Sequence, residues 1–224
     1  MPNASSFALF VAAALVIALT PGPGIFYVAA RTLAGGRREG FASSFGLGLG
    51  GLVHVAAGAA GLSALLMASA DAFAAAKLAG AAYLIWLGIK TIRDARVELP
   101  RNVVVTGAAR AFRDGVIVES LNPKTAAFFL AFIPQFVDPQ QGLVALQFVS
   151  LGLISVTLNT LADIVVVAIA ARARASLSHR PTLIRRMREA SGIIMCGLGA
   201  SLAFARRSAQ TCGNLGLFLQ ASVI

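Results

Sequence analysis

The sequence predicts an all-α membrane protein with six transmembrane helices. Hydrophobic residues make up 58% of the 224-residue chain and charged residues 12%, with a mean hydropathy of +0.81. Soluble domains carry about twice that charged fraction. Six apolar runs also approach the roughly 20 helical residues that cross the hydrocarbon core of a bilayer. The net charge of +10 lies mostly in short connectors between these runs, so we expect a lipid environment and no nucleic-acid partner.

The predicted spans follow one another through almost the whole chain. They cover residues 7–30, 41–70, 72–92, 116–137, 142–171 and 187–205. We expect a single transporter domain over residues 1–206, followed by an atypical tail at 207–224. The first run lacks a preceding basic region and a convincing cleavage site, so it is expected to be a retained span and not a signal peptide.

Basic residues alternate between connectors in a way that predicts orientation. The connectors after the first, third and fifth spans, together with Lys90 and Arg188 at the adjoining ends of the third and sixth spans, hold 15 of the 19 Lys and Arg residues. The other two connectors carry Asp71 and Asp138 and no basic residue. The positive-inside rule then places these three basic connectors in the cytoplasm and both termini outside.

The first predicted span is interrupted by Thr20, Pro21, Gly22, Pro23 and Gly24. Proline removes a backbone donor and blocks the preceding helical turn, and glycine weakens a helix. Within a bilayer, a broken helix is tolerated only where protein or a water-filled cavity satisfies the freed backbone groups. This stretch is therefore a candidate functional site.

A second break is predicted at Pro123, which lies 102 residues after Pro21 in the fourth span. Each break is followed by two further spans. Because three is odd, two three-helix halves must be inverted relative to each other. Broken helices at corresponding positions of two inverted halves indicate a transporter's binding site. The two breaks lie at similar predicted depth, so we expect them to face each other.

Polar residues cluster around the second break. Glu119, Asn122 and Lys124 lie in the fourth span, where an ionisable group is costly unless it is paired or hydrated. One interpretation is a substrate or proton site. The alternative is that Lys124 extends toward the cytoplasmic headgroups with Glu119 as its partner.

Two other spans carry isolated polar residues. In the fifth span Ser155, Asn159 and Asp163 recur every four residues and share a face. Asp163 is a candidate proton-coupling carboxylate, with a structural hydrogen-bonding role as the alternative. In the second span His54 continues a stripe of glycines that we expect to serve helix packing. His54 is a candidate proton relay or, alternatively, a satisfied interior donor.

The sequence contains no motif typical of a metal site, a nucleotide site or a hydrolytic enzyme. The two cysteines and two histidines have no metal-ligand spacing, and we find no phosphate-binding loop and no serine with a nearby base. We therefore expect no metal, no cofactor and no enzymatic activity. An intramembrane enzyme would have only Glu119 with His54 as a loose catalytic pair.

Several motifs in order resemble the LysE/RhtB family of bacterial amino acid exporters. They are Thr20–Gly24, the segment from Gly36 to Gly40, the segment from Lys77 to Gly88, Asn122–Lys124 with Phe128 and Phe129, and Pro134–Phe136. The likeness runs from about Phe7 to Arg206, and the tail beyond it departs from the family.

The resemblance implies a six-helix, multi-pass protein of the bacterial inner membrane. It implies export of an amino acid or derivative, such as threonine, homoserine, homoserine lactone, lysine or leucine, by proton antiport. It also suggests a homodimer, and it directs attention to the two breaks. The alternatives are efflux of a metal cation or another small solute, and a passive channel.

Overall fold

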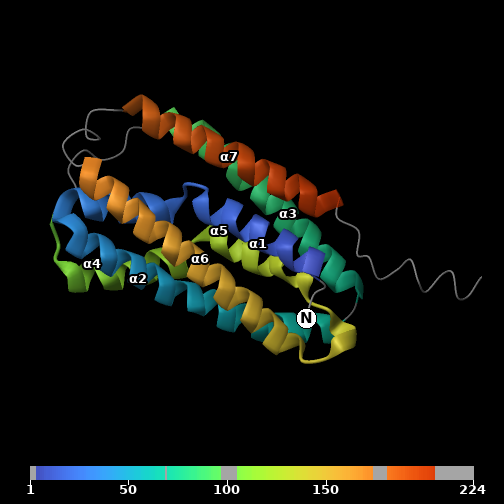
Figure 1. Cartoon of the computed structure of the whole chain (residues 1–224). Coiled ribbons are helices and arrows are strands. Elements are labelled where there is room, and N and C mark those ends of the chain that lie inside the picture. Colours follow the sequence, from blue (N-terminus) through green and yellow to red (C-terminus); the bar gives the residue numbers. More distant parts are fainter. Residues whose placement is uncertain (1–3, 69, 97–104, 174–180, 205–224) are drawn as a thin grey trace, which may run out of the picture.

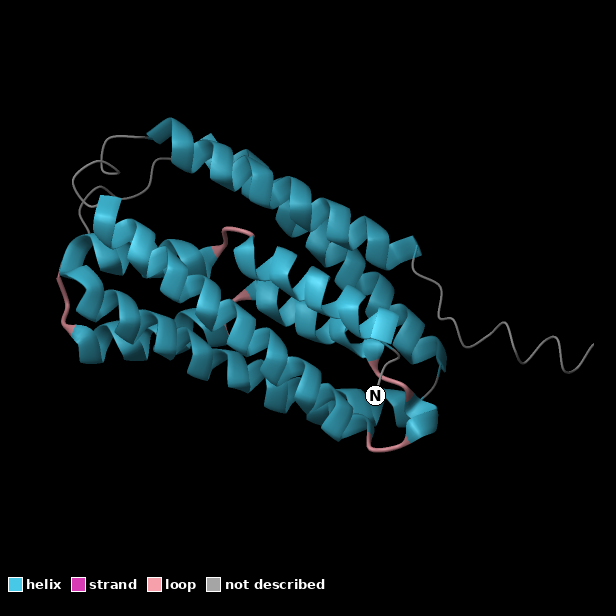
Figure 2. Ribbon diagram, viewed as in Figure 1, coloured by secondary structure: helices cyan, strands magenta, loops and turns pink. Residues whose placement is uncertain are grey.

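Every regular element in the described part of the chain is helical, as predicted. The computed structural model describes residues 4–68, 70–96, 105–173 and 181–204 (Figure 1). Figure 2 shows helices joined by short loops in this part of the chain, without strands. The helices are α1 Ala4–Leu19, α2 Pro23–Ala68, α3 Ala70–Arg93, α4 Ala108–Ser120, α5 Pro123–Ala127, α6 Val144–Ala173 and α7 Pro181–Phe204. The predicted tail at 207–224 lies outside the described residues.

Both predicted helix breaks are present. The first separates α1 from α2, and the second separates α4 from α5. The segment from Pro123 to Phe136 continues from α5 through the π-helix η2 (Phe128–Phe132) and the 3₁₀-helix η3 (Ile133–Phe136), and it is bent by 41° from α4. A proline occupies the start of the helix after each break, where its missing N–H costs nothing.

Helix α2 doubles back on itself at Gly36. This residue has φ 73° and ψ −167°, a backbone conformation open mainly to glycine. In one straight helix Gly24 and Leu47 would lie about 34 Å apart. Instead, a Cβ atom added at Gly24 would lie 2.6 Å from Leu47 Cδ2. The predicted connector at 31–40 is thus not a loop but two helical arms meeting at a glycine.

The helices extend beyond the predicted spans at two other places. Helix α4 begins at Ala108, and α7 begins at Pro181, both before the apolar residues that mark the fourth and sixth spans. Hydropathy locates apolar residues, whereas a helix continues as long as its backbone hydrogen bonds do. In α7 the polar extension also carries an Arg185–Glu189 ion pair one turn apart, at 2.8 Å.

Two of the described helices are long and apolar enough to cross a membrane. They are Pro23–Gly61 of α2 and Val144–Arg172 of α6, and the bent pair of Ala108–Ser120 with Pro123–Phe136 gives a third if it is one span. The coarse prediction of a helical membrane protein is confirmed.

The basic connectors gather at one end of the bundle. The turn at Gly36, the start of α4 and the end of α6 lie together, and we call this the basic end (Figure 1). Arg37, Arg38, Arg110 and Arg172 lie on these segments. The loop with Asp138 and the start of α6 lie at the opposite end (Figure 1).

Glycines permit close approach between the arm of α2 after Gly36 and α4. A Cβ atom at Gly46 would lie 2.2 Å from the carbonyl oxygen of Phe112, and one at Gly50 would lie 2.6 Å from that of Val116. The predicted packing role of this glycine stripe therefore matches the contacts. Toward the opposite end, a core of phenylalanines joins α1, η2 and α6, namely Phe10, Phe128, Phe129, Phe132 and Phe148.

Candidate substrate site at the two helix breaks

The first break ends α1 with a locally satisfied turn. The Thr20 hydroxyl donates to the Val16 carbonyl at 2.5 Å, and the Thr20 amide donates to Ile17 O at 3.2 Å. Pro21 and Pro23 have no N–H, so they cannot continue the helical ladder. The chain restarts as α2, where the Phe26 amide donates to Gly22 O. The last carbonyls of α1 are left needing partners from elsewhere.

The second break is capped by its own asparagine. Asn122 has φ −72° and ψ 110°, the extended conformation that a following proline favours. Its Oδ1 accepts a hydrogen bond from the Lys124 amide at 3.1 Å, and so caps the N-terminus of α5. The sequence Asn-Pro thus ends one helix and starts the next within two residues.

The two breaks are in direct contact through Lys124. Its Nζ donates to Thr20 O at 2.9 Å and to Ile17 O at 3.1 Å, and the residue is only 5% exposed. The C-terminal carbonyls of α1 form the negative end of its dipole, which suits an ammonium group. The alternative in which Lys124 extends toward the headgroups with Glu119 as its partner is wrong. Within the described chain, these two side chains form no ion pair within 4 Å.

The Glu119 carboxylate instead binds neutral donors around the second break. Its Oε1 accepts from the Thr125 hydroxyl at 2.7 Å, and its Oε2 accepts from the Asn122 side-chain amide at 2.9 Å. Glu119 is 7% exposed. A Cβ atom added at Gly24 would lie 3.2 Å from Oε2, so this carboxylate lies close to the N-terminus of α2, the positive end of that helix.

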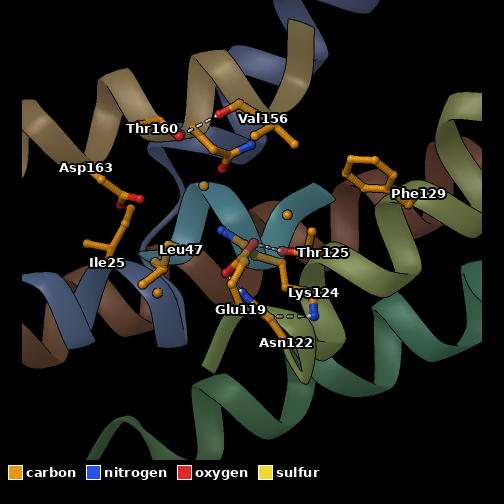
Figure 3. Close-up of a pocket in the computed structure, with 14 residues that line it drawn as sticks. Ile25, Leu47, Glu119, Asn122, Lys124, Thr125, Phe129, Val156, Thr160 and Asp163 are labelled. Carbon is orange, nitrogen blue, oxygen red and sulfur yellow. Dashed lines mark hydrogen bonds between the residues drawn. The ribbon is translucent and has the colours of Figure 1, made fainter. Parts of the chain in front are cut away.

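A cavity lies between these groups and α6 (Figure 3). The enclosed part of this cavity is small, about 20 Å³, which is enough for a water molecule, and a wider space of about 410 Å³ around it includes the open outside. Asp163, Asn159 and Thr160 line it from α6, and Asp163 is 5% exposed. Figure 3 shows Asp163 and Glu119 on different walls, with Leu47 between them. The apolar part of the lining is Ile25, Leu47, Phe129 and Val156.

Half of the twelve candidate residues line the cavity, whereas Pro21, Pro23 and Pro123 shape the breaks without lining it. Gly24, Glu119, Asn122, Lys124, Asn159 and Asp163 all line this cavity. Thr20 and Gly22 do not line the cavity but contact a residue that does. The Thr20 carbonyl accepts a hydrogen bond from Lys124, and a Cβ atom at Gly22 would lie 3.3 Å from the Lys124 side chain.

His54 lies beside the cavity and is not among its lining residues. Its Nε2 forms a 2.8 Å hydrogen bond with the Glu119 carbonyl, and its ring lies 5.8 Å from that of Phe129. Because a carbonyl only accepts, Nε2 must carry the proton. This contact favours the alternative of a satisfied interior donor over the proton relay.

Sequence reasoning missed two groups of polar residues. Thr125 binds Glu119 although it was not singled out. Arg31 and Glu39 form a buried ion pair at the basic end, with Arg31 NH1 3.6 Å from Glu39 Oε2. The sequence does contain a signal for this ion pair, because Glu39 is the only acidic residue before Asp71. Among the described residues, no group of three or more His, Cys, Asp or Glu side chains is arranged to hold a metal ion.

Comparison with known proteins identifies the family. A model described as "LysE type translocator" matches residues 15–206. The chain belongs to the LysE translocator family. It is a transport protein of the bacterial inner membrane and not an enzyme.

Three relatives show how similar the chain is to known members of the family. A homoserine/homoserine lactone efflux protein of Salmonella typhi is 32% identical over 194 residues, which cover 86% of this chain and 93% of the relative. An uncharacterized membrane protein of Vibrio cholerae is 32% identical over 201 residues, 88% of this chain and 96% of the relative. A leucine efflux protein of an Enterobacter species is 28% identical over 137 residues, 59% of this chain and 64% of the relative. No solved structure matches the chain.

Proposed function

We propose that this protein is a secondary transporter that exports an amino acid or derivative by proton antiport through the cavity at the two breaks. The observation that carries the proposal is the contact between Lys124 and the carbonyls of Ile17 and Thr20 beside a cavity with two carboxylates. Relatives named for efflux of homoserine, homoserine lactone and leucine support the substrate class.

The proposed topology is six spans in two inverted halves, with the basic end in the cytoplasm and both termini outside. The first span is α1 with the first arm of α2, and the fourth is α4 with the segment from Pro123 to Phe136. In an inverted repeat the two halves meet at an interface around the binding site. The contacts of α3 with α7, and of α2 with α4 and α6, place helices of the two halves against each other and support this arrangement. A homodimer is part of the proposal, suggested by family resemblance.

The proposed binding mode assigns the substrate's ammonium group to Asp163 and Glu119. The apolar wall of Leu47, Phe129 and Val156 would receive its side chain. The substrate's carboxyl or lactone oxygens would face Lys124 and the N-terminus of α2, because both present positive charge. Proton and substrate ammonium then compete for Asp163, and this competition couples export to proton influx.

Replacing Asp163 by Asn tests this coupling. The change keeps the size of the side chain and removes the charge for which proton and substrate compete. In vesicles containing the purified protein, we expect proton-driven transport of labelled homoserine, homoserine lactone or leucine to stop, while the protein still inserts. Asp138→Asn is the matched control, because Asp138 lies in the loop at the opposite end of the bundle. Normal coupled transport by the Asp163 variant would refute the assignment.

The substrate is identified by growth on a panel of inhibitory amino acids, dipeptides and lactones. Overexpression should give resistance to the true substrate, and deletion should give sensitivity. Metal salts belong in the panel, because efflux of a metal cation or another small solute is the competing function. Resistance to a metal alone would replace the amino acid proposal.

A further inference from the structure

Polar groups around the buried Glu39 join α2 to the start of α4 at the basic end. Glu39 Oε1 accepts hydrogen bonds from the amides of Thr106 and Gly107 at 2.9 and 2.6 Å. Arg31 NH1 donates to the Thr106 hydroxyl at 2.7 Å and lies 3.6 Å from Glu39 Oε2. We call these four residues the latch. It connects the first half of the protein to the second.

Glu39 is the buried member of the latch, and its carboxylate is only partly satisfied by hydrogen bonds. Glu39 is 2% exposed, and the two amides it accepts from lie just before α4, with Gly107 at the N-cap. A carboxylate at a helix N-terminus is favoured by the helix dipole. In the described chain, however, Glu39 Oε2 accepts no hydrogen bond and has only the longer contact to Arg31. An incompletely paired buried charge can be released at a lower cost than a fully bonded one.

Apolar packing lies between the latch and the cavity. Val28, Leu47 and Val167 form a buried cluster of their own, with Tyr27 packed against it. Along both arms of α2 and along α6, residues follow the same order from the cavity toward the basic end. It runs from Ile25 through Val28 to Arg31, from Gly48 through Leu47 to Glu39, and from Asp163 to Val167.

The contacts of Tyr27 close the same side of the cavity. Its hydroxyl donates to Ala111 O on α4 at 2.9 Å, and the Arg31 guanidinium lies 5.6 Å from the centre of its ring. A solute from the basic end would therefore have to pass the latch, Tyr27 and the apolar cluster to reach Asp163.

We propose that the latch is the gate at the basic end of the transport pathway. This rests on the proposed function only in that the cavity is taken as the substrate site. Opening requires the start of α4 to separate from α2, so Glu39 must release both amides and Arg31 must release Thr106. Glu39 is thus a positioning residue that holds the closed state and does not touch substrate.

A cysteine placed behind the latch reports whether this gate opens. Ser43 is fully buried one turn after Glu39, where it lies next to the Tyr27 hydroxyl, and Ser43→Cys is nearly isosteric. With Cys196→Ala and Cys212→Ser as background, N-ethylmaleimide labels the new thiol in membrane vesicles. We expect Glu39→Gln to speed this labelling by about tenfold or more, the effect of weakening closure by one charge-assisted contact.

Two controls separate gating from general loosening. Asp114→Asn removes an acid from α4 whose ion pairs are with Arg110 and Arg113 at the exposed surface, and should leave the Ser43→Cys rate unchanged. Ser155→Cys is equally buried on α6 and outside the cavity lining, and its labelling should not respond to Glu39→Gln. Faster labelling at both cysteines would indicate unfolding and overturn the proposal.

A second variant decides the case if Glu39→Gln fails to reach the membrane. Thr106→Val removes the hydroxyl that binds Arg31 and keeps the amide that binds Glu39, so it should speed labelling by a smaller factor. Unchanged labelling in the inserted variants would overturn the gate. The readout needs no substrate, so it is separate from failure of the proposed function, which the vesicle transport assay reports.

Discussion

The protein buries two glutamates beside basic residues, and the two sites are built differently. At the basic end Glu39 faces Arg31 and also accepts from two backbone amides. At the breaks, Glu119 and Lys124 turn away from each other, so that the acid binds two neutral side chains and the base binds two carbonyls. The first arrangement joins two segments. The second leaves both charges beside the cavity that we propose as the substrate site.

This difference in bonding predicts how strongly each site depends on a single charged side chain. Among the described residues, Lys124 is the one donor found for Thr20 O, whereas the start of α4 is held at the latch by several bonds at once. Loss of one group should therefore matter more at the breaks than at the basic end.

Lys124→Met is the strongest test of this comparison. The methionine keeps the apolar stem but removes the buried donor of the Thr20 carbonyl, and it leaves the Ile17 carbonyl with only the amide of Thr20. A hydrogen bond to a charged group contributes about 1.5–3 kcal/mol, so we expect export to fall by about 100-fold or more. The measurement is the initial rate of substrate export by vesicles with matched protein content.

Arg31→Met is the matched variant at the basic end. It removes the Thr106 hydrogen bond and the contact with Glu39 but leaves the two amide bonds of Glu39 in place. We expect a loss of about tenfold or less, equivalent to about 1.4 kcal/mol. An Arg31 variant as damaging as Lys124→Met would contradict the comparison.

Thr125→Val tests one of the two neutral side chains that donate to Glu119, and it should reduce export less than Lys124→Met does. Valine preserves the shape of threonine and removes the 2.7 Å hydrogen bond to Glu119 Oε1. We expect export to fall by about tenfold, since a charge-assisted hydrogen bond contributes about 1.5 kcal/mol or slightly more. Thr157→Val is the control on α6, because that hydroxyl only donates to Leu153 O in its own helix. Equal effects of the two changes would remove Thr125 from the site.

Local backbone chemistry made the breaks predictable from the sequence. Pro-Gly-Pro and Asn-Pro prevent a continuous helix wherever they occur, so both interruptions followed from residue type alone. The cavity-facing position of Asp163 was also predictable, because a lone acid in an apolar span must face inward.

The partners of these groups were not predictable, for physical reasons. The acceptors of Lys124 are backbone carbonyls, which every residue carries, so no side-chain pattern reveals them. Threonine hydroxyls in helices ordinarily return to a carbonyl one turn back, as at Thr20, Thr32 and Thr160. The Thr125 hydroxyl donates to Glu119 instead, because the second break places the Glu119 carboxylate within hydrogen-bond distance.

Arg31 was assigned to a loop because basic residues between apolar runs normally lie in connectors. The turn at Gly36 occupies a single residue instead, so both flanking arms stay helical and Arg31 lies half-buried against Glu39. The positive-inside rule uses charge alone, and it gives the same orientation whether an arginine is in a loop or in a latch.

His54→Gln carries the smallest expected effect and decides between the two interpretations of that residue. Glutamine can keep a donor near the position of Nε2, and so keep the bond to the Glu119 carbonyl, but it cannot carry a proton between groups. If His54 is an interior donor, export should stay within about twofold of wild type, whereas His54→Ala should lose about fivefold, equivalent to about 1 kcal/mol. If it is a relay, both variants should abolish proton-driven export while leaving exchange of labelled for unlabelled substrate. The comparison of the two buried glutamates favours the donor, because a fixed hydrogen bond at the end of α4 keeps the Glu119 side chain in position beside the cavity.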